Sequence, residues 1–131
     1  MKLELRHLAP YLPYGLKMKW IEGDMIYKLT RLSTAGLACV DENGYRTPFD
    51  YEHIKPILRP LSDLSEKIEH EGKKFVPMNK LPRVGVYDVR DLECSYLDMQ
   101  KLFEWHFNVF DLPQKLWVDI NTIKEFNPKG E

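Results

Sequence analysis

The sequence lacks the features that mark membrane, secreted and disulfide-stabilised proteins. None of its 131 residues belongs to a run of eighteen apolar residues, so we expect no membrane partner. Its first residues alternate charged and apolar side chains and contain no apolar secretory segment, so we expect a cytoplasmic protein. There are only two cysteines, Cys39 and Cys94, and they lie far apart. In a reducing compartment each is expected to pack as a small hydrophobe.

Recognisable catalytic and metal-binding patterns are absent as well. The four histidines have no partner at i,i+4 and no cysteine or histidine at ligand spacing; they are His7, His53, His70 and His106. No glycine-rich loop follows an expected strand, and no serine lies in a nucleophile elbow. We therefore predict no catalytic residue, no metal and no cofactor, and a protein that is not an enzyme.

The chain also lacks an excess of either charge, because 19 Lys and Arg residues are balanced by 20 Asp and Glu residues. Such a balance is too weak for nonspecific binding to nucleic acid. One local exception is the segment 72–87, which contains no acid and carries Lys73, Lys74, Lys80 and Arg83. Two interpretations stay open for this segment: an ordinary solvated surface, or a contact with nucleic acid.

What the sequence does have is a series of short strand patterns over residues 15–60. Leu16, Met18 and Trp20 alternate with lysines, as in a strand with one buried face. Residues 26–32 and 37–42 are further strands, and Asn43-Gly44 predicts a hairpin with a two-residue type I′ turn. A last short strand falls between Pro56 and Pro60, which confine it to an edge or a closing position. The order predicts an α+β protein with a lead-in turn and a small SH3-like β-barrel in residues 1–61.

Residues 62–131 are expected to form an α+β region packed with the barrel as one globular unit. Residues 68–76 predict a second hairpin around Glu71-Gly72, although a helix that ends at Gly72 is an open alternative. A long amphipathic helix is expected at about 96–110, because one arc of it is strongly aromatic, and we expect this helix to be the main core element. His106 lies on that arc and is interpreted as a satisfied core residue rather than a general base.

Binding candidates are few. Trp105 falls on the polar arc of the expected helix, so it is either covered by another part of the chain or available to a partner. Tyr14 and Tyr51 are aromatic residues beside the expected barrel, where exposed rings form grooves for peptides. The basic candidates are Lys73, Lys74 and Arg83.

Four segments of the chain also resemble segments of other proteins. They are KPILRPLSDL (residues 55–64), FVP (75–77), KLFEWHFNVF (101–110) and DIN (119–121). These blocks resemble recurrent segments of small uncharacterised proteins encoded in prophages and mobile elements of anaerobic gut bacteria. The resemblance implies a phage or mobile-element context, and that group defines no catalytic or binding residue.

Two functional hypotheses follow from these observations. The first is a non-enzymatic protein-binding or assembly module, whose partner is another protein or a second copy of the chain. The alternative is a nucleic-acid-binding accessory protein that uses the basic segment. The lack of chemistry favours the first hypothesis.

Overall fold

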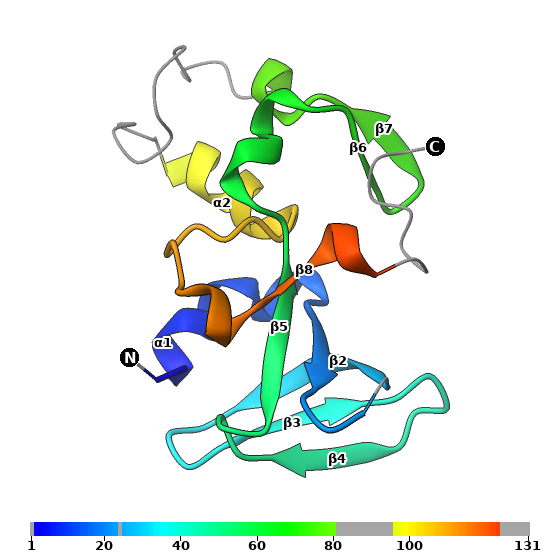
Figure 1. Ribbon diagram of the computed structural model, residues 1–131, viewed down its shortest axis with the longest axis vertical. Coiled ribbons are helices and arrows are strands. Elements are labelled where there is room, and N and C mark those ends of the chain that lie inside the picture. Colours follow the sequence, from blue (N-terminus) through cyan, green and yellow to red (C-terminus); the bar gives the residue numbers. More distant parts are fainter. Residues whose placement is uncertain (1, 24, 81–95, 124–131) are drawn as a thin grey trace.

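The computed structural model describes residues 2–23, 25–80 and 96–123 and contains a mixed six-stranded sheet and a separate hairpin (Figure 1). The strand order of the large sheet is β4-β3-β2-β1-β5-β8. Its strands are β1 (Lys17–Trp20), β2 (Ile26–Leu32), β3 (Leu37–Val40), β4 (Arg46–Phe49), β5 (Ile54–Leu58) and β8 (Val118–Asp119). All neighbours are antiparallel except β5 and β8. The hairpin consists of β6 (Ile68–His70) and β7 (Lys73–Phe75).

The helical elements are short. The α-helices of the described residues are α1 (Leu5–Leu8) and α2 (Tyr96–Glu104). Short 3₁₀ helices in the described ranges are η1 (Ala9–Tyr14), η2 (Leu61–Ser65), η3 (Pro77–Lys80), η5 (Gln114–Leu116) and η6 (Ile120–Thr122). Within the described ranges, no helix has both the length and the apolar character that crossing a membrane requires.

The prediction of an SH3-like barrel is wrong. Closing a barrel requires the two outer strands to pair, but in the described sheet the outer strands are β4 and β8, at opposite ends of the strand order. The free side of β5 pairs in parallel with β8, through Ile57 with Val118 and Leu58 with Asp119. Pro56 was expected to keep this strand at an edge or a closing position, yet β5 lies inside the sheet between β1 and β8. The sheet remains open.

The individual strands of residues 15–60 agree with the sequence pattern, although the barrel does not. Met18 on β1 and Tyr27 and Leu29 on β2 are buried, while Lys28 and Thr30, which alternate with the two buried residues of β2, are exposed. The alternation that predicted these strands is therefore confirmed.

The hairpin around Asn43-Gly44 is confirmed, but its turn type is not the expected one. Among the described loop residues 41–45 only Gly44 has a positive φ, 86°. The Gly44 N–H donates to the Asp41 carbonyl at 3.0 Å, and the Asp41 N–H donates to the Tyr45 carbonyl at 3.1 Å. This is a type I turn followed by a glycine bulge. The Asp41 carboxylate favours it, because Oδ1 accepts from the N–H groups of Asn43 and Tyr45 at 2.9 and 3.0 Å.

The second hairpin is also present, so the alternative of a helix ending at Gly72 is wrong. His70 pairs directly with Lys73, which leaves a two-residue turn. Glu71 and Gly72 have φ values of 51° and 82°, as a type I′ turn requires at both positions. This turn therefore places a glutamate in the left-handed region, where L-residues are uncommon.

The expected long helix is wrong as well, because α2 ends at Glu104. The His106 N–H donates to the Phe103 carbonyl and the Phe107 N–H to the Leu102 carbonyl, both at 3.0 Å. These two bonds form a Schellman motif in which His106, with φ 62°, takes the place usually held by glycine. Residues after the stop then bond to the end of β5: the Arg59 N–H donates to the His106 carbonyl at 2.7 Å, and the Asn108 N–H to the Arg59 carbonyl at 2.9 Å.

Apolar burial divides into two clusters, so α2 is not the main core element. The larger cluster lies against the big sheet and contains Leu8, Tyr11, Leu16, Met18, Leu29, Leu37, Cys39, Ile54 and Leu58, among others. A smaller cluster contains Leu64, Ile68, Leu102, Trp105 and Phe107. Cys39 packs as the expected small hydrophobe, and burial raises the pKa of its thiol to about 12. Cys94 lies outside the described residues.

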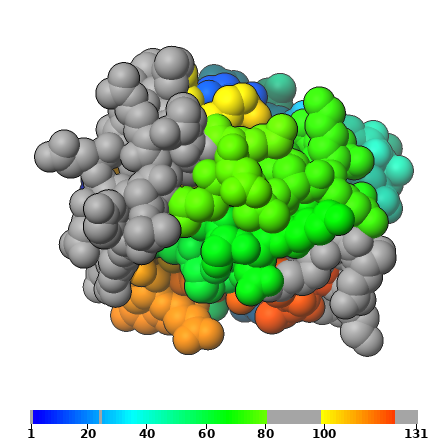
Figure 2. Space-filling view, turned by 90° about the horizontal axis from the view of Figure 1, so that it is seen from above, coloured from blue at the N-terminus to red at the C-terminus, as the bar shows by residue number. Residues whose placement is uncertain are grey.

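The two clusters occupy different ends of the molecule. In Figure 1 strands β2, β3 and β4 lie at one end, α2 and the β6–β7 hairpin at the other, and β5 runs between them. Seen from above that second end, residues 61–80 form the green surface in the middle of Figure 2, next to yellow α2. β5 and Arg59, the residue that follows it, therefore connect the two ends.

Candidate functional site

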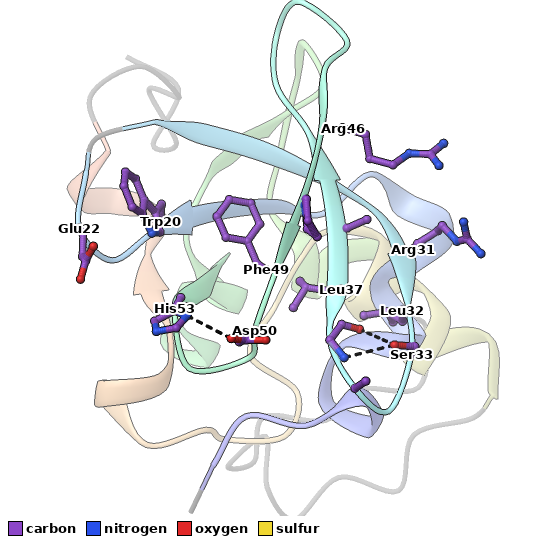
Figure 3. Close-up of a pocket in the computed structure, with 14 residues that line it drawn as sticks. Trp20, Glu22, Arg31, Leu32, Ser33, Leu37, Arg46, Phe49, Asp50 and His53 are labelled. Carbon is purple, nitrogen blue, oxygen red and sulfur yellow. Dashed lines mark hydrogen bonds and ion pairs between the residues drawn. The ribbon is translucent and has the colours of Figure 1, made fainter.

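A hollow of about 700 Å³ lies on the end of the molecule formed by β1–β4. Figure 3 shows Trp20, Phe49, Leu37 and Leu32 in a row across it, with Glu22 at one end. Trp20, Phe49 and Leu32 are half-buried, so each presents apolar surface to solvent while it packs against the larger core cluster. Apolar surface that is open but held in place by a core is what a binding groove needs.

Ring packing and close backbone approaches hold the aromatic side chains of the hollow. The ring of Phe49 meets Tyr27 edge-on, with the centroids 5.0 Å apart. Gly23 lies so close to the Trp20 indole that an added Cβ would be 3.0 Å from it, and a Cβ on Gly36 would be 2.7 Å from the Phe49 carbonyl oxygen. Space therefore requires glycine at position 36, next to the Phe49 backbone, and leaves little room for a larger residue at position 23, next to the Trp20 ring.

Two arginines at one side of the hollow carry charge that nothing in the described chain neutralises. Arg31 on β2 and Arg46 on β4 are exposed, and both lie on the side of the row away from Glu22 (Figure 3). Within the described ranges neither takes part in an ion pair. The acidic side chain Asp50 is instead paired with His53 at 3.6 Å. This side of the hollow is therefore positive.

The outer edge of β4 is poorly suited to the addition of another strand. The register pairs Cys39 with Thr47 and Ala38 with Pro48. The hydrogen bond that closes the hairpin joins Asp41 to Tyr45. Because hydrogen-bonded pairs alternate along an antiparallel ladder, the backbone hydrogen-bonding positions of Arg46 and Pro48 face away from β3, toward the free edge. Proline has no N–H, so this edge lacks a donor in its middle. A partner would consequently bind the hollow through side chains rather than by extending the sheet.

The aromatic candidates named from the sequence do not gather into one groove. Trp105 is 4% exposed and packs against Phe75 with ring centroids 5.0 Å apart, so it is covered by the chain itself, which is one of the two outcomes expected for it. Tyr14 is half-buried, and its carbonyl accepts a hydrogen bond from His106 Nε2 at 2.8 Å. The Tyr51 hydroxyl donates to the Ser33 carbonyl at 2.5 Å. None of the three lines the hollow.

His106 is a satisfied buried residue, as expected, although it follows the helix rather than lying on it. It is 7% exposed and donates from Nε2 to the Tyr14 carbonyl. Burial lowers its pKa to about 3, so the ring is neutral at physiological pH. A base that is so weak and already bonded is a poor proton acceptor.

The basic candidates are only partly described. Lys73 and Lys74 are exposed on β7, and in the hairpin register Lys74 lies opposite Glu69. Lys80 places its ammonium group 5.4 Å from the centre of the Phe75 ring. Arg83 lies outside the described residues. In the ranges the structure describes, no group of three or more His, Cys, Asp or Glu side chains could hold a metal ion.

Sequence reasoning did not predict the hollow, because it favoured a buried position in the core for Trp20 over an exposed one in a groove. The spacing of Gly23 and Gly36 next to Trp20 and Phe49 was an available signal, but their approach is visible only in three dimensions. Comparison with protein-family models, with curated proteins and with solved structures finds no match for this chain.

Proposed function

We propose that the protein is a non-enzymatic protein-binding or assembly module and that the hollow beside Trp20 and Phe49 receives its partner. The observation that carries this proposal is the row of half-buried apolar side chains next to two unpaired arginines. An apolar groove with charge on one side fits a peptide segment that combines an apolar anchor with nearby acidic residues. The protein contributes a preformed surface to this interaction and performs no chemistry.

The context of this function is part of the same proposal. The resemblance of four sequence blocks to proteins of prophages and mobile elements supports a partner encoded by a phage or its host. The fully buried Cys39 thiol agrees with a reducing, cytoplasmic compartment. Binding of nucleic acid has weaker support, because Lys74 lies opposite an acidic residue on the hairpin.

A displayed peptide library screened against the purified protein tests the proposal. We expect selected peptides to share an aromatic or aliphatic residue flanked by Asp or Glu. Replacing both arginines, Arg31→Glu with Arg46→Glu, should weaken binding of the selected peptide by about tenfold or more, because two favourable charge interactions become repulsive. Trp20→Leu should weaken it by removing the largest apolar contact, with circular dichroism as the check on folding.

A matched control is the double change Lys73→Glu with Lys74→Glu, which reverses two exposed charges at the other end of the molecule. Peptide binding should be unchanged in this variant. If no peptide is selected, or if selected peptides bind the hollow variants as well as the wild type, the proposed function is wrong. If a nucleic acid binds and only the lysine variant loses it, the alternative function is correct.

A further inference from the structure

Strands β1, β2 and β5 place four lysines next to one another on one face of the large sheet. In the register, Lys17 on β1 lies directly opposite Lys28 on β2, and Lys19 on β1 lies directly opposite Lys55 on β5. Lys17 and Lys19 are two residues apart on one strand, so they belong to the same face. Met18 between them faces the other way, into the larger core cluster. We call the four residues Lys17, Lys19, Lys28 and Lys55 the lysine face.

The lysine face contains two like-charged pairs that nothing in the described chain neutralises. Like charges on directly opposite residues of neighbouring strands weaken a sheet. Lys28 is exposed and the other three lysines are half-buried. Within residues 2–23, 25–80 and 96–123 none of the four takes part in an ion pair, and Lys19 donates from Nζ to the Gly23 carbonyl at 3.0 Å. Their charges therefore remain available to an anion outside the chain.

This side of the sheet continues across β3 and β4 without an acidic residue. Lys28 lies opposite Val40, and Val40 lies opposite Arg46. Arg31 lies opposite Ala38, two residues before Val40, so both arginines extend the lysine face. The remaining residues of β1–β4 on this side are Ile26, Thr30, Ala38, Val40 and Pro48. Neighbouring strands are about 4.8 Å apart, so the cations from β4 to β5 extend over roughly 20 Å.

Acidic side chains border the lysine face but do not cancel its charge. Glu22 and Glu42 are exposed in loops beyond the ends of the strands. Glu69 and Glu71 of the β6–β7 hairpin line a pocket together with Lys17, yet neither forms an ion pair with it. The near-zero net charge of the chain thus conceals an uneven distribution, with cations concentrated on one side of the sheet.

We propose that the lysine face binds double-stranded nucleic acid through its phosphate groups. Lysine and arginine neutralise phosphates and release the counterions that surround them, which supplies the affinity. An open face of roughly 20 Å reaches several phosphates of a duplex, which carries one charge for about every 1.7 Å of its axis. Contacts with phosphates carry no sequence information, so this binding does not depend on base sequence. It is a second activity, separate from the binding of a peptide in the hollow.

The composition of this side of the sheet favours a duplex over other anionic partners. Proteins hold single strands largely by stacking aromatic rings on the bases, and β1–β4 present no aromatic ring on this side. Tight contacts with a protein partner centre on buried aromatic or large apolar anchors, which are also missing here. A phosphate backbone requires cations alone.

Fluorescence anisotropy of a labelled DNA duplex, measured at several sodium chloride concentrations, tests the proposal. We expect the logarithm of the association constant to fall linearly with the logarithm of the salt concentration, with a slope of about −4 to −5. This slope corresponds to about 0.9 for each neutralised phosphate, with four lysines and two arginines available. A duplex of unrelated sequence should bind equally well, and the corresponding single strand more weakly.

Paired substitutions assign the binding to this face. Lys17→Gln with Lys28→Gln removes one like-charged pair and should reduce the magnitude of the slope by about 2. Lys19→Gln with Lys55→Gln should have the same effect. Both double variants should melt at the wild-type temperature or above it, because each removes a repulsion. The matched control is Lys73→Gln with Lys74→Gln, which neutralises two exposed lysines of the β6–β7 hairpin and should keep the wild-type slope.

Several results would overturn the proposal. They are the absence of duplex binding at low salt, a slope that neither lysine pair of the face changes, and tighter binding of the single strand. Polyglutamate is the comparison for an acidic protein: if it binds as tightly as the duplex and depends on the same lysines, the face recognises acidic protein instead. A peptide selected for the hollow should bind the Lys17→Gln, Lys28→Gln variant as it binds the wild type, so a failure of peptide binding and a failure of duplex binding are distinguishable.

Discussion

The two ends of this molecule are built in different ways. The sheet region, residues 17–58, includes strands such as β2 and β3, in which buried residues alternate with less buried ones as the sequence pattern predicts. The Arg59 region, residues 59–80 and 96–109, consists of short pieces joined through one buried side chain and its backbone. The local sequence pattern is sufficient to predict the structure where a strand has one solvent-exposed face and one buried face. It is insufficient where polar groups far apart in sequence must satisfy each other.

Their hairpins show the same difference on a smaller scale. Asn43-Gly44, the strongest turn signal in the chain, forms a type I turn with a glycine bulge, because the Asp41 carboxylate bonds two N–H groups of the loop. Glu71-Gly72 carries a weaker signal but forms the two-residue turn with both φ values positive. In the first hairpin a local side chain decides the geometry. In the second the strand register and the burial of Ile68 against the smaller cluster decide it.

Replacing Arg59 should have the largest effect, because this residue connects the two regions. Arg59→Met leaves the Trp105 and Glu69 carbonyls without their donors, and we expect the free energy of unfolding to fall by about 3–6 kcal/mol. Urea unfolding followed by NMR measures the free energy of unfolding of each region separately. Arg31→Met, at an exposed arginine without an ion pair in the described chain, should change it by less than about 0.5 kcal/mol. A loss of less than about 1 kcal/mol at Arg59 would contradict its role as the connection.

A matched pair of tryptophans compares the cores of the two regions. Trp105→Ala empties the smaller cluster and should cost about 3–5 kcal/mol. Trp20→Ala removes a half-buried ring beside the hollow and should cost about 1–2 kcal/mol. Thermal and urea denaturation provide both values. If Trp105→Ala proved the milder of the two, the indole would have to be more accessible than its packing against Phe75 indicates.

Acid should weaken the Arg59 region through its neutral histidine. His106 has a pKa of about 3 when folded and about 6.5 when unfolded, so below pH 6.5 the unfolded chain takes up a proton that the folded chain does not. The stabilisation is complete above pH 6.5 and is lost as the pH falls toward 3. His106 should account for about 2 kcal/mol of the loss between pH 7 and pH 5.

His106→Asn is the matched variant for this prediction. Asparagine tolerates the positive φ of this position and does not titrate. Urea unfolding at several pH values should therefore show a shallower dependence in the variant than in the wild type. An unchanged dependence would assign the acid sensitivity to other groups, such as His7 or His70, whose pKa values burial also lowers.

The smallest expected effect concerns the turn of the second hairpin. Glu71 holds a φ of 51°, which asparagine adopts more readily, so Glu71→Asn should raise the free energy of unfolding by about 0.5–1 kcal/mol. Glu42→Asn is the control in the first hairpin, since Glu42 is not in the left-handed region, and it should show no gain. Thermal melts resolve differences of this size. Equal changes in the two variants would mean that backbone strain is not the cause.

The sequence predicted the strands of the sheet region and both hairpins, but not how they assemble. It did not predict the parallel contact between β5 and β8, because the composition of a short strand does not reveal which strand it pairs with. It also did not predict the hollow beside Trp20, since a half-buried tryptophan and a buried one have the same periodicity. The burial of Arg59 was beyond prediction for a further reason: an arginine between two prolines appears as a surface residue until its acceptors are known.

What the sequence by itself determined is the alternation of the strands and the positions of the reversals, because these depend on side chains a few residues apart. Tertiary structure decided where α2 ends, that Trp105 is enclosed and that Arg59 is buried. Helical periodicity continues through residue 110, but the chain after Glu104 gains backbone hydrogen bonds to Arg59 instead. Arg59 in turn donates to the carbonyl of Trp105, a residue 46 positions away. Hydrogen bonds between such distant residues leave no periodic trace in the sequence, and here they outweigh the local preference for helix.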